Sequence, residues 1–295
     1  MRILGRTSLI AGLPLLLSLA SVAYAADVLI VDAKSSPESL TVAPGGVVIV
    51  GSASTPFVYK LAPQATTAEK FIDVSSEGPG TFFFGMLADP ANKTLWTCQL
   101  TPVAGATPPR RHTALRSFDL QTAAPKIRWD LPGDNTVCND FAFGPDRALY
   151  ITDTANAKVY RLAAGSSTPE LFIENPALRG IDGITFLDGT LYVNSVSASK
   201  IFRIPITGGK AGEPVEITLD QPIKGPDGMR SANGRLFVAE NGAGKISAIK
   251  IDGDKGTVTV LKDGLQTPTG IQPAGDTLWF TERATGKVMS MPMPK

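Results

Sequence analysis

Apolar and polar residues alternate in short runs along most of the chain, and Gly, Pro, Asn and Asp separate the runs. Alternation with a period of two is typical of half-buried β-strands, and these four residue types favour turns. Runs with the spacing of an amphipathic helix are scarce beyond residue 25. The pattern therefore predicts an all-β protein.

One pattern recurs six times: a short apolar strand, a turn, and a second strand rich in apolar or aromatic residues. The copies cover residues 38–52, 84–99, 139–153, 182–195, 227–240 and 269–282. Their second strands begin at Val48, Leu95, Leu149, Leu191, Leu236 and Leu278, at intervals of 42 to 54 residues. Repeats of this length that hold several strands are typical of propeller blades. We therefore expect a six-bladed β-propeller.

Third strands follow the copies, and outer strands are expected at "ELFI" (170–173), "VEITL" (215–219) and "TVTVL" (257–261). The sixth copy has no outer strand of its own, because the sequence ends at Lys295 soon after its third strand. "DVLIVD" (27–32) precedes the first copy and can supply the missing strand. Closing the ring in this way leaves no open sheet edge. Residues 26–295 are thus predicted to form a single propeller domain, closed by an N-terminal strand that completes the last blade.

The first 25 residues have the pattern of a secretory signal peptide. Arg2 and Arg6 make the start positive, residues 9–22 are mostly apolar, and Ala23-Tyr24-Ala25 resembles a cleavage site. The alternative is a membrane anchor, but the apolar run is short for a span of about 20 residues. We expect residues 1–25 to be removed and the protein to be periplasmic or secreted.

The charge balance argues against a nucleic-acid or membrane partner. The formal net charge is +1, and it becomes −1 without the two arginines of the predicted signal. No strong field attracts nucleic acid or an anionic membrane surface. We expect a monomer that binds a small-molecule substrate, with no nucleic acid and, after signal removal, no membrane as partner.

The chain has two cysteines, Cys98 and Cys138. In an oxidising compartment such a pair suggests a disulfide, and the spacing is not that of a zinc site. The alternative is two buried thiols. The disulfide is the expectation here.

The first residue of each copy should lie on a common rim, because the inner strands of a propeller all start at one mouth of the central channel. These rim positions are Glu38, Phe84, Asn139, Asp182, Asp227 and Thr269. Four of the six are carboxylates or amides, and Asp140 adds an acid beside Asn139. In a single blade such a residue could simply cap a turn. Their convergence on one axis favours a shared site.

A cation would relieve the repulsion among the rim acids. Two carboxylates roughly 5 Å apart repel by about 3 kcal/mol at an effective dielectric constant of about 20, and without a cation some would stay protonated. Oxygen donors at Glu38, Asn139, Asp182 and Asp227, without His or Cys, favour a hard cation. We expect Ca²⁺, with Zn²⁺, Mg²⁺ and Mn²⁺ as the other candidates, in a site that stays open to water or substrate.

The sole histidine lies in "TPVAGATPPRRHTALRS", which is predicted to be the longest connection between a second and a third strand. That connection should emerge at the same mouth as Asp227. Arg110, Arg111 and His112 are therefore candidate substrate-binding residues, and His112 could also shuttle protons. The alternative is a solvated basic loop.

Four of these segments resemble the regucalcin/gluconolactonase (senescence-marker-protein-like) family of metal-dependent six-bladed propeller hydrolases. They are "PESLTVAPGG", "NDFAFGPDRALYITD", "DGITFLDGTLYVNS" and "GPDGMRSANGRLFVAENGAGKI". The resemblance implies that Glu38, Asn139, Asp182 and Asp227 are metal ligands, that Asp227 is also the general base, and that Asp140 assists it. Asp182 departs from the family pattern, because the family usually has Asn there.

The closing segment "PTGIQPAGDTLWFTERATGKV" resembles the streptogramin-lyase branch of propellers, and strictosidine-synthase-like propellers share the general pattern. The lyase branch uses a histidine in its site, and none lies in this segment. The leading expectation is a metal-dependent hydrolase of the lactonase type, in which the cation activates the ester carbonyl and water. The alternatives are a non-catalytic ligand- or protein-binding propeller and an enzyme of the lyase or strictosidine-synthase type.

Overall fold

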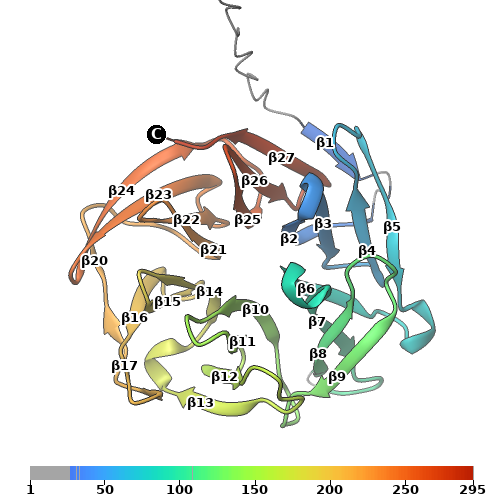
Figure 1. The fold of residues 1–295 in the computed structure, drawn as a ribbon, viewed down its shortest axis with the longest axis horizontal. Coiled ribbons are helices and arrows are strands. Elements are labelled where there is room, and N and C mark those ends of the chain that lie inside the picture. The colour runs from blue at the N-terminus through green and yellow to red at the C-terminus, as the bar shows by residue number, and fades with distance from the viewer. Residues whose placement is uncertain (1–26, 31, 33, 108, 295) are drawn as a thin grey trace, which may run out of the picture.

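A computed structural model describes residues 27–30, 32, 34–107 and 109–294, which form six β-sheet blades in a ring (Figure 1). The all-β, six-bladed propeller predicted from the repeats is confirmed. No helix in this part of the chain is long and apolar enough to cross a membrane. The predicted signal at 1–25 lies outside the described residues. The helical turns among the described residues are η1 (Pro44–Gly46), η2 (Ser75–Glu77), η3 (Pro90–Asn92) and η4 (Pro176–Leu178).

Each of the first three blades is a four-stranded antiparallel sheet whose strands follow one another outward from the central axis. Blade 1 holds β2 (Pro37–Ala43), β3 (Val47–Ser52), β4 (Phe57–Leu61) and β5 (Thr67–Asp73). Blade 2 holds β6 (Phe82–Asp89), β7 (Thr94–Pro102), β8 (Arg111–Asp119) and β9 (Pro125–Asp130). Blade 3 holds β10 (Cys138–Phe143), β11 (Leu149–Asp153), β12 (Lys158–Leu162) and β13 (Glu170–Glu174).

The last three blades keep this order with additions at their outer edges. Blade 4 holds β14 (Ile181–Leu187), β15 (Thr190–Ser195), β16 (Lys200–Ile204) and β19 (Val215–Glu216), with a small hairpin of β17 (Ile206–Thr207) and β18 (Lys210–Ala211). Blade 5 holds β21 (Pro226–Ala232), β22 (Arg235–Glu240), β23 (Lys245–Asp252), β24 (Lys255–Lys262) and the edge strand β20 (Thr218–Leu219). Blade 6 holds β25 (Pro268–Ala274), β26 (Thr277–Glu282), β27 (Lys287–Pro292) and β1 (Asp27–Ile30).

The ring closes as the sequence predicts. β1 pairs antiparallel with β27 and so completes blade 6. It also pairs in parallel with the start of β5, so that blades 1 and 6 are hydrogen-bonded into one eight-stranded sheet. The N-terminal strand therefore leaves neither blade with a free edge at the closure point.

Turn chemistry fixes the register of the inner hairpins. β14 and β15 are joined by Asp188-Gly189, and β21 and β22 by Asn233-Gly234. All four residues have positive φ, between 49° and 79°. That geometry belongs to the tight two-residue hairpin turn that Asp-Gly and Asn-Gly favour. The turns set which side chains of the inner strands face the channel.

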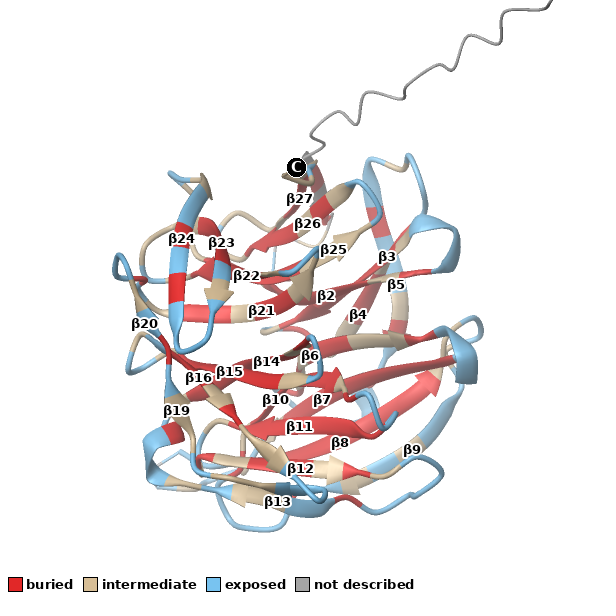
Figure 2. Cartoon of the chain, turned by 60° about the vertical axis from the view of Figure 1, so that its left-hand side comes forward, coloured by how far each residue is buried: buried red, intermediate tan, exposed pale blue. Residues whose placement is uncertain are grey.

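The core is divided among the interfaces between blades. Six hydrophobic clusters occur in the described residues, and each lies between two neighbouring blades. Figure 2 shows that buried residues dominate the inner strands, while outer strands such as β9 and β13 are exposed or half-buried. The inner strands also contact one another in sequence around the ring, from β2 through β6, β10, β14, β21 and β25 back to β2.

One expectation about the outer strands was wrong, and one about a connection holds with narrower bounds. "VEITL" was expected to be one outer strand, but Val215–Glu216 pairs with blade 4 and Thr218–Leu219 pairs with blade 5. The connection before β8 is the longest between a second and a third strand, as expected, because residues 103–110 separate β7 from β8. It is shorter than the quoted segment, since Thr101, Pro102, Arg111 and His112 are paired within the two strands.

Candidate functional site

Every inner strand has an irregularity at the predicted rim. In five blades two residues of the inner strand stand opposite one residue of the second strand, which is the pattern of a β-bulge. These pairs are Glu38-Ser39, Asn139-Asp140, Asp182-Gly183, Asp227-Gly228 and Thr269-Gly270. In blade 2 the extra residue is Gly85. Bulges re-aim side chains, and here they turn the rim residues toward the axis.

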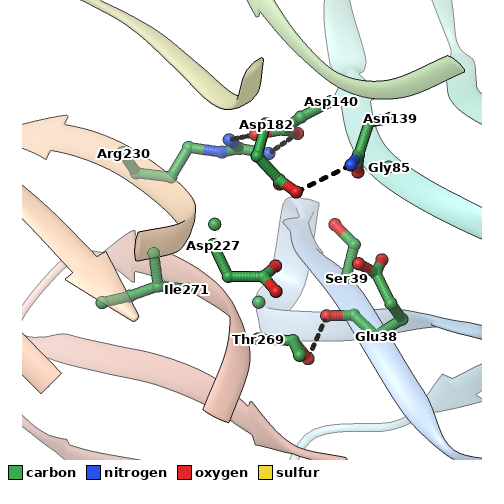
Figure 3. A pocket seen from close by; sticks show the side chains of 12 residues that line it. Glu38, Ser39, Gly85, Asn139, Asp140, Asp182, Asp227, Arg230, Thr269 and Ile271 are labelled. Atoms are coloured by element: carbon green, nitrogen blue, oxygen red, sulfur yellow. Dashed lines mark hydrogen bonds and ion pairs between the residues drawn. The ribbon is translucent and has the colours of Figure 1, made fainter. Parts of the chain in front are cut away.

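The rim residues meet in one pocket on that axis (Figure 3). The predicted ligands Glu38, Asn139, Asp182 and Asp227 all line it, as do Asp140 and Thr269. Phe84 does not line it, and Gly85 takes its place. The remaining lining residues are Ser39, Gly228, Arg230, Gly270 and Ile271. The rim alignment thus brings together side chains from five blades, and the four predicted ligands come from four of them.

The pocket is narrow because the inner strands touch. A Cβ atom on Gly183 would lie 2.6 Å from the carbonyl oxygen of Asp227, and one on Gly228 would lie 2.5 Å from that of Thr269. The cavity between the strands has a volume of about 10 Å³. That room suits one ion or one water molecule, so a larger ligand would lie above it at the mouth.

Four buried carboxylates line this space, and Asp140 is the one that forms a salt bridge among the described residues. Glu38, Asp182 and Asp227 are 5%, 6% and 9% exposed. Burial raises the pKa of the Glu38 and Asp182 carboxyls well above their usual range, and the nearby Asp227 charge raises both further. Burial also raises the pKa of Asp227 to about 6. The protein alone therefore supplies too little positive charge to keep all three ionised at neutral pH.

Hydrogen bonds hold some of the rim atoms and leave others open. Asn139 Nδ2 donates to Asp182 Oδ2 (2.8 Å) and to Thr154 Oγ1 (2.9 Å). Asn241 Nδ2 donates to Asp227 Oδ2 (3.1 Å). Glu38 Oε2 is buried and accepts no hydrogen bond from the described residues. An unpaired carboxylate oxygen in a buried site is costly unless a cation or proton meets it.

Asp140 lies in the same pocket but is already paired. Arg230 of β21 reaches across to β10, and its Nη1 and Nη2 donate to Asp140 Oδ2 (2.6 Å) and Oδ1 (2.8 Å) (Figure 3). Both side chains are buried. Sequence reasoning missed Arg230. The available signal was an arginine three residues after Asp227, inside a strand expected to line the channel.

The predicted substrate-binding residues lie apart from this pocket. Arg111 and His112 begin β8 in the long hairpin, are exposed, and do not line the pocket. Arg110 lies 3.8 Å from Asp134 in an exposed ion pair. Their role in substrate binding stays a prediction.

The two cysteines are bonded and buried. The disulfide joins the middle of β7 in blade 2 to the first residue of β10 in blade 3. β7 continues beyond Cys98 to Pro102. Because Cys138 directly precedes Asn139, the bond anchors the strand that carries this rim residue.

The chemistry of the donor atoms fits a hard cation. Carboxylate and amide oxygens are the ligands that Ca²⁺ prefers, and Glu38, whose Oε2 has no partner among the described residues, lines a pocket with room for one ion. The described residues hold no ready-made cluster of three or more His, Cys, Asp or Glu side chains at ligand spacing. The rim side chains would therefore have to move toward the ion, and Asp182 would exchange its bond from Asn139.

The chain matches no protein-family model and no curated protein. Solved structures do resemble it. They include a gluconolactonase from Xanthomonas campestris (TM-score 0.65, 18% identity, 88% of this chain and 86% of that one). They also include virginiamycin B lyase from Staphylococcus aureus (TM-score 0.65, 16% identity, 92% and 99%) and a chain of a nidogen–laminin complex (TM-score 0.62, 18% identity, 84% and 89%). At these identities the likeness establishes the propeller fold that all of them share.

Proposed function

We propose that this protein is a divalent-metal-dependent hydrolase that acts on a lactone or a related ester. One observation carries the proposal. Oxygen side chains from four different blades converge on one narrow axial pocket, where Glu38 Oε2 is buried without a partner. The likeness to a gluconolactonase structure supports this choice among hydrolases.

Glu38, Asn139, Asp182 and Asp227 would hold the cation, for which Ca²⁺ is the first choice. When bound, a divalent cation polarises a carbonyl and favours the ionised form of a bound water. Asp227 would accept the proton from the attacking water. Asp140 suits that role less, because both of its oxygens accept from Arg230.

The substrate would lie over the pocket at the mouth, since the pocket itself is too narrow for a ring. Arg110, Arg111 and His112 are proposed to contact it from the long hairpin. A periplasmic or secreted location is part of the proposal. It rests on the pattern of residues 1–25 and on the buried disulfide, which oxidising compartments favour.

The test is a screen of the purified protein against sugar and aliphatic lactones, with and without EDTA. Turnover should be lost in EDTA and return with Ca²⁺. Asp227→Asn, which keeps the shape of the side chain, should lower kcat at least 100-fold, as loss of a general base does. The surface variant Asp252→Asn is the control and should match the wild type. Failure of every lactone and ester to react in a metal-dependent way would refute the proposal.

A second candidate is a propeller that binds a ligand or protein without catalysis. The narrow pocket favours this second candidate, because a site with room for one ion can have a purely structural role. In that case Ca²⁺ would bind and stabilise the fold, yet no substrate would turn over. Calorimetric titration of Ca²⁺ beside the activity screen separates the two candidates.

A further inference from the structure

The second strand of every blade has one residue beside the bulge that faces the next blade. We call these six residues the linking positions. They are Gly51, Cys98, Thr152, Asn194, Ala239 and Thr281. Their contacts with the next blade differ in a pattern that follows the rim residues.

Three linking positions join the bulge of their own blade to the rim residue of the next blade by hydrogen bonds. Thr152 Oγ1 accepts from the Asp140 amide (3.0 Å) and donates to the Asp182 carbonyl (2.9 Å). Asn194 accepts from the Gly183 amide (2.9 Å) and donates to the Asp227 carbonyl (2.6 Å).

Thr281 repeats this arrangement at the closure of the ring. Its Oγ1 accepts from the Gly270 amide (2.7 Å) and donates to the Glu38 carbonyl (3.0 Å). The side chains of Thr152, Asn194 and Thr281 are completely buried. Each of the three rim carboxylates is thus held through its own peptide group by the preceding blade, and the Glu38 carbonyl also accepts from Thr269 Oγ1 of that blade (2.6 Å).

The fourth link is covalent. Cys98 is the linking position of blade 2, and its disulfide fixes Cys138, the residue before Asn139. The two remaining positions are Gly51 and Ala239, whose side chains cannot hydrogen-bond. They precede the blades whose rim residues are Phe84 and Thr269, which are not among the four proposed ligands. At the linking positions, links therefore occur where a ligand follows and are missing where none follows, although Met86 N of blade 2 donates to Ser39 Oγ of blade 1 (3.1 Å).

We propose that Cys98, Thr152, Asn194 and Thr281 are positioning residues that preorganise the four-ligand site, an inference that rests on the proposed function. The physical reason is local. A hydrogen bond to the carbonyl of a bulged residue restrains its backbone dihedrals, and these dihedrals set the direction of its Cα–Cβ bond. Residues that orient ligands in this indirect way typically change metal affinity by about 10- to 100-fold when they are altered.

The test compares Thr152→Val and Thr281→Val with Thr97→Val. Thr97 is a matched control, because it is also completely buried on a second strand, yet it donates to the Phe84 carbonyl of its own blade (3.1 Å). Calcium binding is measured by calorimetry, and the melting temperature is measured in EDTA. We expect Kd to rise about 10-fold or more for the first two variants and less than about twofold for Thr97→Val. Thr152→Ser and Thr281→Ser, which keep the hydroxyl, should restore the wild-type value.

Two results would overturn the positioning role. One is an unchanged Kd in both test variants. The other is an equal rise in Thr97→Val, which would trace the effect to general loss of stability. If the wild type binds no divalent cation, the proposed function fails instead. The positioning role is then tested by crystal structures of the variants grown in EDTA. Thr152→Val should displace the Asp182 carboxylate there and Thr97→Val should not, and an undisplaced Asp182 would refute the links.

Discussion

Asp140 and Arg230 form the one pair of opposite charges that crosses the axial pocket within the described residues. Both are more than nine-tenths buried, and their two hydrogen bonds have the forked geometry of a strong carboxylate–guanidinium pair. Desolvation makes such a pair a weak source of net stability, but it makes a single unpaired member very costly. We therefore expect strong energetic coupling between Asp140 and Arg230.

Asp140→Asn or Arg230→Met alone should lower the free energy of unfolding by about 3–5 kcal/mol, because each leaves a buried charge without its partner. The double variant should lose much less than the sum of the two. Denaturant titrations measure all three changes. The exposed pair Lys200–Glu216 is the control, and Glu216→Gln should cost less than about 1 kcal/mol. Strictly additive losses at Asp140 and Arg230 would contradict the coupling.

At the scale of the strands, the structure shows what the sequence pattern could and could not predict. The six inner and second strands, and their rim residues, follow from alternation and from repeat length. The outer strands β5 and β9 were not predicted, because they are largely exposed and their apolar–polar alternation is weak. The split of "VEITL" between two blades depends on tertiary pairing that no local signal encodes. The reach of Arg230 to Asp140 likewise requires the ring, because 90 residues separate them.

The close approach of the inner strands predicts which glycines are indispensable. In Gly183→Ala the new methyl group would meet the Asp227 carbonyl and the Met229 amide, each 2.6 Å away. Because backbone atoms cannot move aside cheaply, we expect a loss of about 1–3 kcal/mol or more in the free energy of unfolding. Gly212→Ala is the control, since its neighbours lie 3.5 Å or farther and its φ is not positive. Chemical denaturation compares them, and equal stability of both variants would argue against tight inner-strand contact.

The disulfide links strands of two neighbouring blades across 40 residues of sequence. In the chain-entropy model a loop of that length is worth about 3–4 kcal/mol. Replacing both cysteines by alanine should therefore lower the free energy of unfolding by roughly that amount in denaturant titrations. The double variant should be insensitive to reductant, whereas the wild type should approach it after reduction under mild denaturation. Full stability of the reduced wild type would contradict this prediction.

At the scale of the whole molecule, six blades bring their inner strands to one axis, and the acids on those strands meet there. Ring closure through β1 keeps the blades together, so the repulsion among Glu38, Asp182 and Asp227 acts on the entire fold. Their raised pKa values mean that the folded metal-free protein holds protons that the unfolded chain releases. Fold stability and proton binding are therefore linked.

The sign of this linkage gives the last prediction. A carboxyl with a raised folded pKa contributes full stability below its unfolded pKa and loses it as pH rises through the folded value. For Asp227 that window runs from its ordinary value of 3.8 to about 6, so metal-free protein should lose up to about 3 kcal/mol from this group between pH 4 and pH 7.5. Asp227→Asn, which cannot ionise, should lose correspondingly less in EDTA. Adding Ca²⁺ at pH 7.5 should restore stability to the wild type more than to the variant, because a ligand of the folded state adds RT ln(1 + [Ca²⁺]/Kd). Denaturant titrations at both pH values measure these differences, and parallel pH profiles of the two proteins in EDTA would show that Asp227 is not the group that titrates.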